Sequence, residues 1–304
     1  MTLKVAIIIL NWENAPATQE CARSVVDEMR QCNGIASSHL WIVDNGSGDS
    51  SKNELEAWLD NLDIPVSFIA NPENLGFSGG MNKGIFAAFD RDRFDYFWLL
   101  NNDLIVEPGS LSSLLQSTIE GPDVAIWGST VKDAATSKIQ CAGGCRYNRW
   151  LGKESQVYSG LEASEIPSLK RPRLDYIYGA AMFVRGELLE RLHGLNEDYF
   201  LFYEELDLVK QLRLEENIGW CIDSNVVHKG GGSSASKVIK TFAAYHAALS
   251  AFKFTRRYYP YCLPTVVMSR VLGLAIHAVH YRNPELALAP LRAFRDLYNA
   301  GTQG

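Results

Sequence analysis

The stretch "YFWLLNND" (residues 96–103) decides the fold, because a wholly apolar run gives way abruptly to three polar residues. The run "YFWLL" (96–100) carries no charge and predicts a buried strand. Asn101, Asn102 and Asp103 follow directly where this strand ends. In open α/β sheets the ligand crevice lies outside the carboxyl ends of the strands, so these three residues are candidates for a site.

Three further apolar runs precede this one, and longer amphipathic segments separate them. The runs are "VAIIIL" (5–10), "HLWIV" (39–43) and "VSFIA" (66–70). The segments at 14–33, 50–61 and 78–91 have the length and pattern of helices. Alternation of this kind predicts an α/β fold with a mostly parallel, Rossmann-like sheet and helices on both faces.

Polar residues also follow the other three runs. Asn11 follows the first, Asp44-Asn45-Gly46-Ser47 the second and Asn71-Pro72 the third. Asn, Asp and Gly end many strands simply because they form turns. Four such endings in succession favour a shared site at one edge of the sheet.

Composition fits an ordinary globular protein. The chain has 304 residues, 47% of them hydrophobic and 21% charged, and a net charge of −6. This charge gives no general reason to expect nucleic-acid binding. The apolar run at 5–10 is short for a signal peptide, and the six cysteines match no zinc spacing, so we expect reduced thiols and a cytoplasmic location.

The second half of the chain divides near residue 235. "LDYIYGAAMFVR" (174–185) and "GWCID" (219–223) are strand-like, and "VVHKGGGSS" (226–234) predicts a flexible loop. Beyond Ser236 the pattern is helical, with breaks at Pro260 and Pro284. We therefore expect an α/β domain over 1–235 and a helical region over 236–304.

Acidic residues gather in "YFLFYEELDLVKQLR" (199–213). In a helix over 203–214, one face carries a carboxylate among apolar residues, namely Glu205, Leu208, Val209 and Leu212. Glu204, Asp207 and Gln211 fall on a more polar side. Glu205 is thus predicted to face the interior, where desolvation suits a general base. The alternative is an acidic helix start that the helix dipole favours.

Asp103 and His228 are candidate metal ligands. Asp103 lies between two apolar segments, where a carboxylate commonly holds Mg²⁺ or Mn²⁺. It could equally cap its own turn. His228 follows an apolar pair and precedes three glycines, and a neutral imidazole would complement Asp103 as a ligand, although a lone histidine is more often structural.

The segment "NPENLGFSGGMNKG" (71–84) combines four glycines with a predicted helix start. Helix N-terminal amides are a natural seat for a diphosphate. The spacing matches neither the dinucleotide fingerprint nor the phosphate-binding P-loop, and the first loop, "NWENAP" (11–16), lacks glycine. By itself the glycine segment indicates no particular nucleotide.

Six segments taken together resemble family 2 glycosyltransferases of the A-type fold, and among these the rhamnosyltransferase-like branch. They occur in the same order, as "VAIIILNW" (5–12), "IVDNGSGDS" (42–50), "NPENLGFSGGMNKGI" (71–85), "LLNNDLIVEPGSL" (99–111), "FLFYEELDL" (200–208) and "VVHKGGGSS" (226–234). The resemblance covers about residues 3–235, and its glycine-rich and "NND" segments are its most specific parts.

The resemblance implies inverting transfer of a sugar such as rhamnose from a dTDP- or UDP-linked donor to an acceptor hydroxyl. Asp44 matches the residue that contacts the base, and Asp103 the last acid of the metal-binding motif. Glu205 matches the catalytic base and His228 a downstream metal ligand. The substrate-binding residues expected in full are Asn11, Asp44, Asn74, Gly76, Gly79, Gly80, Asn82, Asn102 and Glu204.

The chemistry implied by the resemblance is consistent with these residue types. A divalent cation, Mg²⁺ or Mn²⁺, held by Asp103 and His228 would stabilise the diphosphate leaving group. Glu205 would take the proton of the attacking hydroxyl. Two departures from the family pattern are Asn101 in place of the first metal-motif acid, and Glu204-Glu205 in place of Glu-Asp.

The segment at 252–282 mixes aromatic, basic and apolar residues. Arg270 and His277 interrupt it, which leaves less than the roughly 20 apolar residues of a spanning helix. Two interpretations stay open. The segment could lie on the inner membrane surface and serve a glycan or lipid-linked acceptor, or it could pack on the catalytic domain or a second subunit, which we favour slightly.

Two other functions are compatible with the pattern. A nucleotidyltransferase also combines an α/β fold with Mg²⁺, but would usually carry a glycine- and basic-rich first loop, which "NWENAP" is not. A degenerate module that binds a sugar nucleotide without turnover is favoured by Asn101 and by the Glu-for-Asp change at 205.

Overall fold

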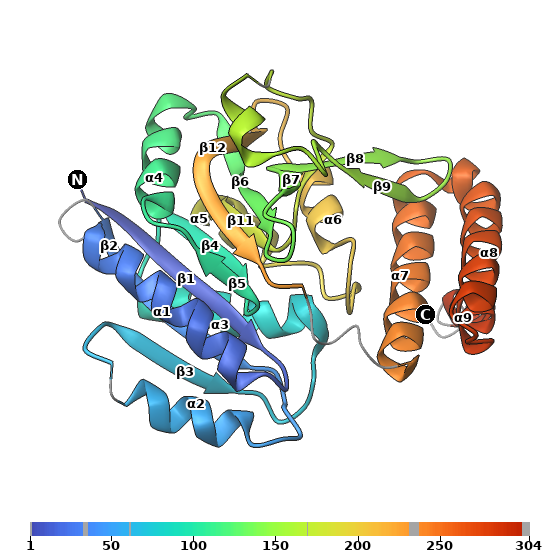
Figure 1. Cartoon of the computed structure of the whole chain (residues 1–304), viewed down its shortest axis with the longest axis horizontal. Coiled ribbons are helices and arrows are strands. Elements are labelled where there is room, and N and C mark those ends of the chain that lie inside the picture. The colour runs from blue at the N-terminus through green and yellow to red at the C-terminus, as the bar shows by residue number, and fades with distance from the viewer. Residues whose placement is uncertain (1, 33–35, 61, 169, 231–236, 300–304) are drawn as a thin grey trace.

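The computed structural model describes residues 2–32, 36–60, 62–168, 170–230 and 237–299 (Figure 1). Its central sheet has the strand order β3-β2-β1-β4-β11-β6-β12-β5, with β7 paired to β6. The strands are β1 (Leu3–Asn11), β2 (Ala36–Asp44), β3 (Val66–Ala70), β4 (Tyr96–Asn101), β5 (Leu104–Val106), β6 (Val124–Asp133), β7 (Ile139–Ala142), β11 (Ala181–Arg185) and β12 (Asn217–His228).

The four N-terminal strands are parallel, as the sequence predicted. Their register aligns Asn11 with Asp44 and Leu10 with Asn101, so the polar strand ends meet at one edge. β11 then runs antiparallel between β4 and β6, while β12 is parallel to β6. The predicted crevice edge therefore exists, and β12, which runs in the same direction as β4, ends at this edge with His228.

Alternation along β1 explains why helices cover both faces of the sheet. Val5, Ile7 and Ile9 belong to one buried cluster, and Ala6 and Ile8 to the other. The helices α1 (Ala15–Gln31), α2 (Ser51–Leu59) and α4 (Ser110–Glu120) contribute to the first cluster, and α3 (Gly76–Arg91) and α5 (Gly186–Leu192) to the second. The three helices predicted in the first 100 residues are confirmed within two residues at each end.

Two predicted strands have different bounds in the structure. The run at 174–185 is split into β10 (Tyr176–Ile177) and β11 by a turn at 178–180. The strand predicted at 219–223 extends as far as His228, because Val226 and Val227 pair with β5 and β6. The predicted flexible loop at 226–234 is therefore wrong up to His228, and its residues 231–234 lie outside the described chain.

A small antiparallel sheet projects beside the main one. It has the order β10-β8-β9, with β8 (Gly144–Asn148) and β9 (Lys153–Gln156) forming a hairpin, and the short helix η1 (Ala163–Ser168) follows. Gly128 permits this arrangement, since a Cβ there would lie 1.9 Å from the carbonyl oxygen of Gly143. The hairpin tip extends toward the C-terminal helices (Figure 1).

The C-terminal region forms a helical bundle at one side of the sheet (Figure 1). It contains α7 (Lys237–Tyr258), the turn η3 (Pro260–Cys262), α8 (Leu263–His280) and α9 (Glu285–Asn299). The breaks predicted at Pro260 and Pro284 are confirmed, since α7 ends before Pro260 and α9 begins after Pro284, although α9 itself continues through Pro290.

One helical segment within the described residues, Pro260–His280, is long and apolar enough to cross a membrane. Its 21 residues include a window with mean hydropathy 1.6, of which only 17% is buried. The expectation that Arg270 and His277 leave this stretch too short is therefore wrong by length and composition. Length alone does not decide where the helix lies.

Candidate functional site

A cavity of about 690 Å³ lies at the carboxyl ends of β1, β2 and β4. Its walls come from the sheet edge, from the segments 74–77 and 200–202, and from α7, α8 and α9. The lining residues on the sheet side are Leu10, Trp12, Asn45, Asn74, Gly76, Phe77, Asn101, Asp103, Tyr178 and His228. This volume is in the range of pockets that enclose cofactor-sized ligands.

Asp103 and His228 meet in this cavity although 125 residues separate them. His228 Nε2 lies 3.1 Å from Asp103 Oδ2, because the last residue of β12 pairs with Leu104 at the start of β5. Nδ1 lies 2.8 Å from the side-chain oxygen of Gln140, whose amide nitrogen donates to the Tyr178 hydroxyl at 3.1 Å. Sequence analysis missed Gln140, since no local pattern distinguishes it.

The pair has features that fit a divalent cation. Donation of the Nδ1 hydrogen to Gln140 leaves the Nε2 lone pair facing the carboxylate, the orientation that metal-binding histidines have. Asp103 Oδ1 is buried and has no hydrogen-bond partner among the described residues. The described chain holds no group of three or more His, Cys, Asp or Glu residues that could bind a metal, so phosphate oxygens would have to complete the coordination.

Asp44 is buried in a network with its neighbours. Its Oδ1 accepts from Asn11 Nδ2 at 2.7 Å and from the Ser47 hydroxyl at 2.6 Å, and Oδ2 accepts from the Ser47 backbone at 3.2 Å. Asn11 Oδ1 accepts from Thr18 at 2.6 Å, and Asn102 donates to the same threonine at 3.0 Å. Asn11, Asp44 and Asn102 are thus brought together at the strand ends, beside the cavity rather than in its lining.

Asn45 is a lining residue that sequence analysis did not single out. Its amide nitrogen donates to Asn74 Oδ1 at 3.0 Å and to the Gly76 carbonyl at 2.9 Å. Its oxygen accepts from Asn71 at 3.0 Å and from the Leu75 backbone at 3.2 Å. Asn45 therefore fixes the glycine segment against the end of β2. Its position next to Asp44 in the sequence is the feature from which it could have been predicted.

Gly76 is required by its backbone. Its φ of +75° is left-handed, and a Cβ there would lie 2.4 Å from the Phe200 carbonyl oxygen. The Phe77 amide donates to this carbonyl at 2.7 Å. Gly76 thus allows the start of α3 to approach the segment that leads into the acidic helix.

The other predicted residues of this segment lie elsewhere. Gly80 allows α3 to pack on β1, since a Cβ would lie 2.6 Å from the Leu10 side chain, and Gly79 packs against Leu75. Asn82 is buried and binds both backbone groups of Leu195 at 2.8 Å. Among the described residues that line the cavity, Gly79, Gly80 and Asn82 do not appear. Helix packing accounts for their positions. A glycine pattern in the sequence looks the same whether the glycines allow helix packing or ligand contact, so the prediction could not tell the two apart.

The acidic helix α6 spans only Glu204–Lys210. Glu204 and Asp207 are buried, whereas Glu205 is half-buried. The prediction that Glu204 and Asp207 fall on the polar side is therefore wrong. The physical reason is that β10 packs on one side of α6 and α7 on another, so the helical period no longer separates an inner face from an outer face.

Burial raises the pKa of both glutamates in the first turn of α6. The pKa of Glu204 is raised to about 7, mainly by burial, with the Glu154 carboxylate adding to the effect. Burial, followed by the neighbouring Glu204 charge, raises the pKa of Glu205 well above its ordinary value. The Oε2 atom of each is buried without a hydrogen-bond partner in the described chain. Burial thus disfavours the ionised form of both carboxyl groups.

Glu205 lies behind the cavity wall. A Cβ added to Gly179 would lie 3.2 Å from Glu205 Oε1, and Gly179 follows Tyr178, which lines the cavity. The described lining includes Asp103 and His228 but not Glu205. The absence of a side chain at residue 179 thus makes room for the carboxyl group.

The backbone that enters α6 is strained. Phe202 and Tyr203 have φ angles of +66° and +76°, which non-glycine residues rarely adopt. The Tyr203 hydroxyl donates to the Gly152 carbonyl at 2.9 Å and accepts from Arg270 at 2.8 Å. Strain of this kind persists where surrounding contacts hold it, and it is frequent near functional sites.

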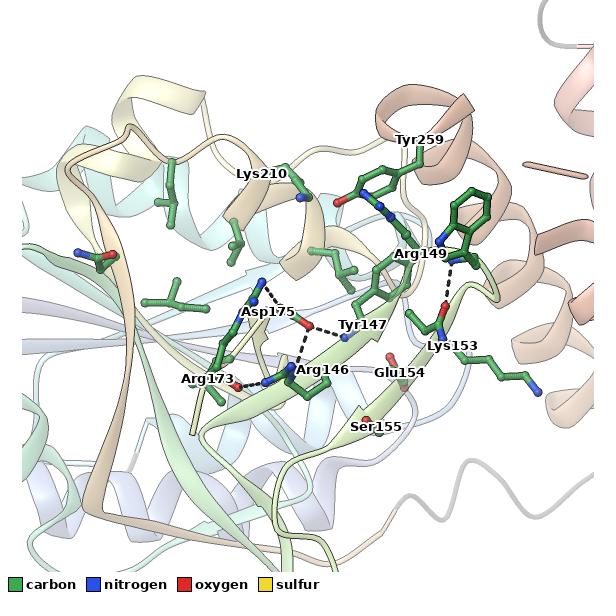
Figure 2. A pocket seen from close by; sticks show the side chains of 18 of the residues that line it. Arg146, Tyr147, Arg149, Lys153, Glu154, Ser155, Arg173, Asp175, Lys210 and Tyr259 are labelled. Carbon is green, nitrogen blue, oxygen red and sulfur yellow. Dashed lines mark hydrogen bonds and ion pairs between the residues drawn. The ribbon is translucent and has the colours of Figure 1, made fainter. Parts of the chain in front are cut away.

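A second cavity, of about 1010 Å³, lies on the other side of α6 (Figure 2). The β8–β9 hairpin, α6 and the segment after α7 line it. Its lining is rich in cations, namely Arg146, Arg149, Lys153, Arg173, Lys210 and Arg213. None of the predicted site residues lines it.

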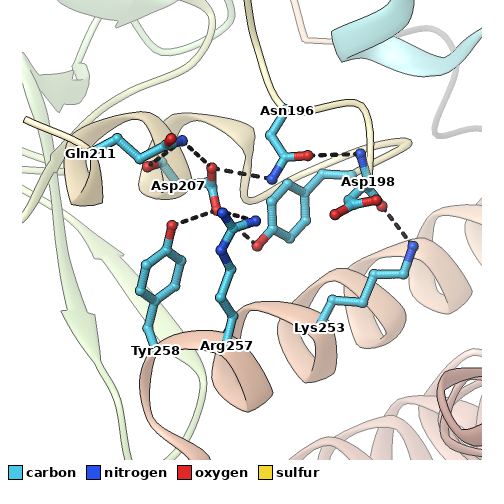
Figure 3. A network of polar contacts seen from close by, with 8 residues as sticks. Asn196, Asp198, Asp207, Gln211, Lys253, Arg257 and Tyr258 are labelled. Carbon is cyan, nitrogen blue, oxygen red and sulfur yellow. Dashed lines mark hydrogen bonds and ion pairs between the residues drawn. The ribbon is translucent and has the colours of Figure 1, made fainter. Parts of the chain in front are cut away.

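Asp207 ties α6 to α7 (Figure 3). Its Oδ1 accepts from the hydroxyls of Tyr199 at 3.1 Å and Tyr258 at 2.9 Å. Its Oδ2 accepts from Gln211 at 2.6 Å and Asn196 at 3.3 Å. A carboxylate that accepts from four donors is a structural anchor, so Asp207 fixes the position of α6.

Comparison with known families gives one match that covers most of the α/β region. The family described as "Glycosyl transferase family 2" matches residues 5–186. This match spans β1 to β11 and ends before α6 and β12.

Two characterised relatives are similar over most of the chain. A low-salt glycan biosynthesis hexosyltransferase, Agl10 of Haloferax volcanii, is 26% identical over 230 residues, which is 74% of this chain and 66% of that protein. An N-acetylglucosaminyl-diphospho-decaprenol L-rhamnosyltransferase of Mycobacterium tuberculosis is 24% identical over 238 residues, or 69% of this chain and 73% of the relative. The alignment thus leaves about a third of the hexosyltransferase unmatched.

Solved structures share the fold. A mannosyltransferase from Pyrobaculum calidifontis in complex with GDP-Man and Mn²⁺ superposes with a TM-score of 0.57 at 14% identity, covering 98% of this chain and 84% of that one. TarS of S. aureus in complex with UDP-GlcNAc gives 0.53 at 11% identity, covering 97% and 92%. The α/β fold is therefore the A-type glycosyltransferase fold.

Proposed function

The chain belongs to glycosyltransferase family 2, and on that premise we propose that it transfers a sugar from a nucleoside-diphosphate sugar to an acceptor hydroxyl with inversion. The observation that carries the proposal is the Asp103–His228 pair, which lines a cavity of donor size at the carboxyl edge of the sheet. An open α/β sheet with such a pair at its ligand edge suits the binding of a diphosphate.

The donor we propose is a dTDP- or UDP-linked sugar. The solved structures with this fold contain GDP-Man in one case and UDP-GlcNAc in another, which supports the nucleoside-diphosphate sugar as a class. We assign the base to the Asp44–Asn45 end of β2 and the diphosphate to the side of Asp103. Rhamnose as the transferred sugar rests on the mycobacterial relative.

Asp103 and His228 would hold a divalent cation, Mg²⁺ or Mn²⁺. Gln140 would orient His228 by accepting its Nδ1 hydrogen, and the unpartnered Asp103 Oδ1 offers a free ligand atom. A cation bound there supplies positive charge beside the diphosphate leaving group. Asn101 cannot contribute a carboxylate, so the substrate phosphates carry more of the coordination.

Glu205 is the proposed general base. The bond between the anomeric carbon and the diphosphate oxygen breaks as the acceptor oxygen bonds to that carbon, and the hydroxyl proton passes to the Glu205 carboxylate. The nucleoside diphosphate leaves with the bonding electrons. A pKa raised by burial lets the carboxyl accept a proton more readily than an exposed glutamate would.

The acceptor we propose is a glycan or a lipid-linked glycan, handled at the cytoplasmic face of a membrane in glycan assembly. The relatives named for glycan biosynthesis and for a diphospho-decaprenol acceptor support this assignment. The helical region 236–304 would supply acceptor contacts, because α7, α8 and α9 close the cavity opposite the sheet.

A second candidate is a sugar-nucleotide-binding module without turnover. It is favoured by Asn101 and by the position of Glu205 outside the described cavity lining. Both candidates bind the donor, but only the enzyme consumes it.

Release of nucleoside diphosphate from the donor separates the two. We expect turnover by the wild type with Mn²⁺ and none with a chelator. Glu205→Gln should lower the rate by about a hundredfold or more while donor binding, measured by calorimetry, is kept. Glu205→Asp serves as the matched control, since it retains the carboxylate and restores the residue usual in the family. Absence of turnover in both wild type and Glu205→Asp, with donor bound, would establish the binding module.

A further inference from the structure

α8 presents an apolar face to solvent. Met268 and Leu272 are each 58% exposed, Ile276 is 68% exposed and Val279 is 81% exposed. These residues are four, four and three positions apart, so they form one stripe along the helix. An exposed apolar stripe of this length marks a surface that another apolar phase covers.

Arg270 and His277 of α8 point away from this stripe. The Arg270 guanidinium donates to the Gly152 carbonyl at 2.5 Å and to the Tyr203 hydroxyl at 2.8 Å. His277 lines the cavity at the sheet edge. With 3.6 residues per turn, both residues fall on the side opposite the stripe. The two interruptions seen in the sequence therefore do not interrupt the exposed face.

The surrounding chain is strongly cationic. Residues 224–284 contain eight lysines and arginines and no aspartate or glutamate, in a protein whose net charge is −6. This charge asymmetry favours an anionic partner for the helical region. It also opposes close approach of a second copy through the same face, because two such regions repel each other.

The β8–β9 hairpin extends the apolar face at one end of α8. The Thr265 hydroxyl donates to the Trp150 carbonyl at 2.6 Å, which fixes the hairpin tip beside the helix. Trp150 is 52% exposed, and Tyr261 at the start of the helical segment is 92% exposed. Aromatic side chains in such positions are typical of a membrane–water boundary.

The cationic cavity lies just behind this tip (Figure 2). Arg149 lies 5.9 Å and the Lys210 nitrogen 5.0 Å from the centre of the Tyr259 ring. No described carboxylate forms an ion pair with Arg149, Lys153 or Lys210, whereas Arg146 and Arg173 pair with Asp175. Three cations thus remain available to an anion of phosphate type.

We propose that this chain docks on an anionic bilayer, with the α8 stripe in the acyl boundary and a lipid phosphate in the cavity beneath the β8–β9 hairpin. The helix lies along the surface, because its other side packs on α7, α9 and the hairpin. This inference rests on the proposed function only for the identity of the lipid, which is either a bulk anionic phospholipid or a lipid-linked diphosphate acceptor.

Co-sedimentation of the full chain with vesicles tests the proposal. We expect binding to vesicles of phosphatidylcholine with phosphatidylglycerol and much weaker binding to phosphatidylcholine alone. The variant Met268→Ser/Leu272→Ser/Ile276→Ser should lose affinity by about a hundredfold, because three apolar side chains no longer enter the boundary. The matched control Phe86→Ser/Ile119→Ser, which removes exposed apolar groups on α3 and α4, should bind as the wild type does.

A second pair of variants tests the cationic cavity beneath the β8–β9 hairpin. Lys153→Ala/Lys210→Ala should weaken binding roughly thirtyfold, at about 1 kcal/mol for each cation near the surface. Lys52→Ala/Arg93→Ala, which removes two exposed cations elsewhere, should leave it unchanged. Vesicles in which polyprenyl diphosphate replaces phosphatidylglycerol identify the lipid, since binding to these alone assigns the phosphate to the acceptor.

Two outcomes would overturn the proposal. One is wild-type protein that sediments with none of these vesicles. The other is a dimer in sedimentation velocity that the serine variant converts to a monomer, because a second copy then covers the stripe. Donor turnover without vesicles, measured on the same samples, keeps the result separate from the proposed transfer reaction.

Discussion

Single residues show how burial gives ordinary side chains unusual properties. Glu204 and Glu205 begin α6, where the helical period predicted Glu205 on the inner face and Glu204 on a more polar side. In the fold Glu204 is buried and Glu205 half-buried, and the Glu204 carboxylate disfavours ionisation of Glu205. Because their pKa values are raised on folding, the two carboxyl groups lower the free energy of unfolding once the pH is high enough to ionise them in the unfolded chain.

Replacement of Glu204 by Gln should stabilise the protein at neutral and alkaline pH but not at acidic pH. The pKa of Glu204 is about 7 in the folded protein and 4.5 as its ordinary value. Between these values the unfolded chain loses the proton first, so the free energy of unfolding of the wild type falls as pH rises. We expect Glu204→Gln to gain about 3 kcal/mol at pH 8 and nothing at pH 4.

Urea unfolding at the two pH values, without added cation, measures this difference. Glu215→Gln, an exposed acid after α6, is the matched control and should show no pH-dependent gain. An equal gain at pH 4 and pH 8 would mean that packing rather than ionisation is responsible.

Elements show how one polar anchor places a helix. α6 has only seven residues, too few to be stable by itself. Its position depends on Asp207, which accepts hydrogen bonds from α7 and from the loop before α6 (Figure 3). The strained residues Phe202 and Tyr203 are held at the other end by Gly152 and Arg270.

Asp207→Asn should destabilise the protein by about 2–4 kcal/mol. The amide offers one acceptor oxygen and puts a donor where the carboxylate accepted, so at least one buried donor loses its partner. Urea unfolding measures the change. Asp198→Asn, an exposed acid nearby, should be neutral, and a comparable loss there would contradict the assigned role of Asp207.

At the scale of the whole molecule, two regions enclose the cavity together. The sheet edge supplies Asp103 and His228, and α7, α8 and α9 supply the opposite wall. A ligand that touches both regions binds only the folded arrangement, so it stabilises the whole chain.

A nucleoside diphosphate with Mn²⁺ should therefore raise the melting temperature. At a ligand concentration a hundred times the dissociation constant, the gain is about 3 kcal/mol, which corresponds to several degrees. We expect the largest rise with dTDP or UDP and none when a chelator is present. A thermal-shift panel of dTDP, UDP and GDP provides the measurement, and no shift with any of them would contradict the assigned donor site.

The sequence alone determined the four N-terminal strands, their parallel direction and the edge where polar residues gather, but not the strand order or the strands β5 to β9. It could do so because uncharged apolar runs of five or six residues, set between amphipathic segments, favour buried strands, and parallel strands align their carboxyl ends. The proximity of Asp103 and His228 was expected from the resemblance, and the structure finds it. Their roles, and that of Glu205, stay proposals.

Only the tertiary structure decided which polar side chains are buried and which apolar ones are exposed. Gln140, Asn45 and Gly179 carry no local pattern, since their partners are distant in the chain. Asp207 contradicts what the helical period predicted, and the apolar stripe on α8 is exposed, because the period reports which residues share a face and not what covers that face. Coverage depends on the packing of the whole chain.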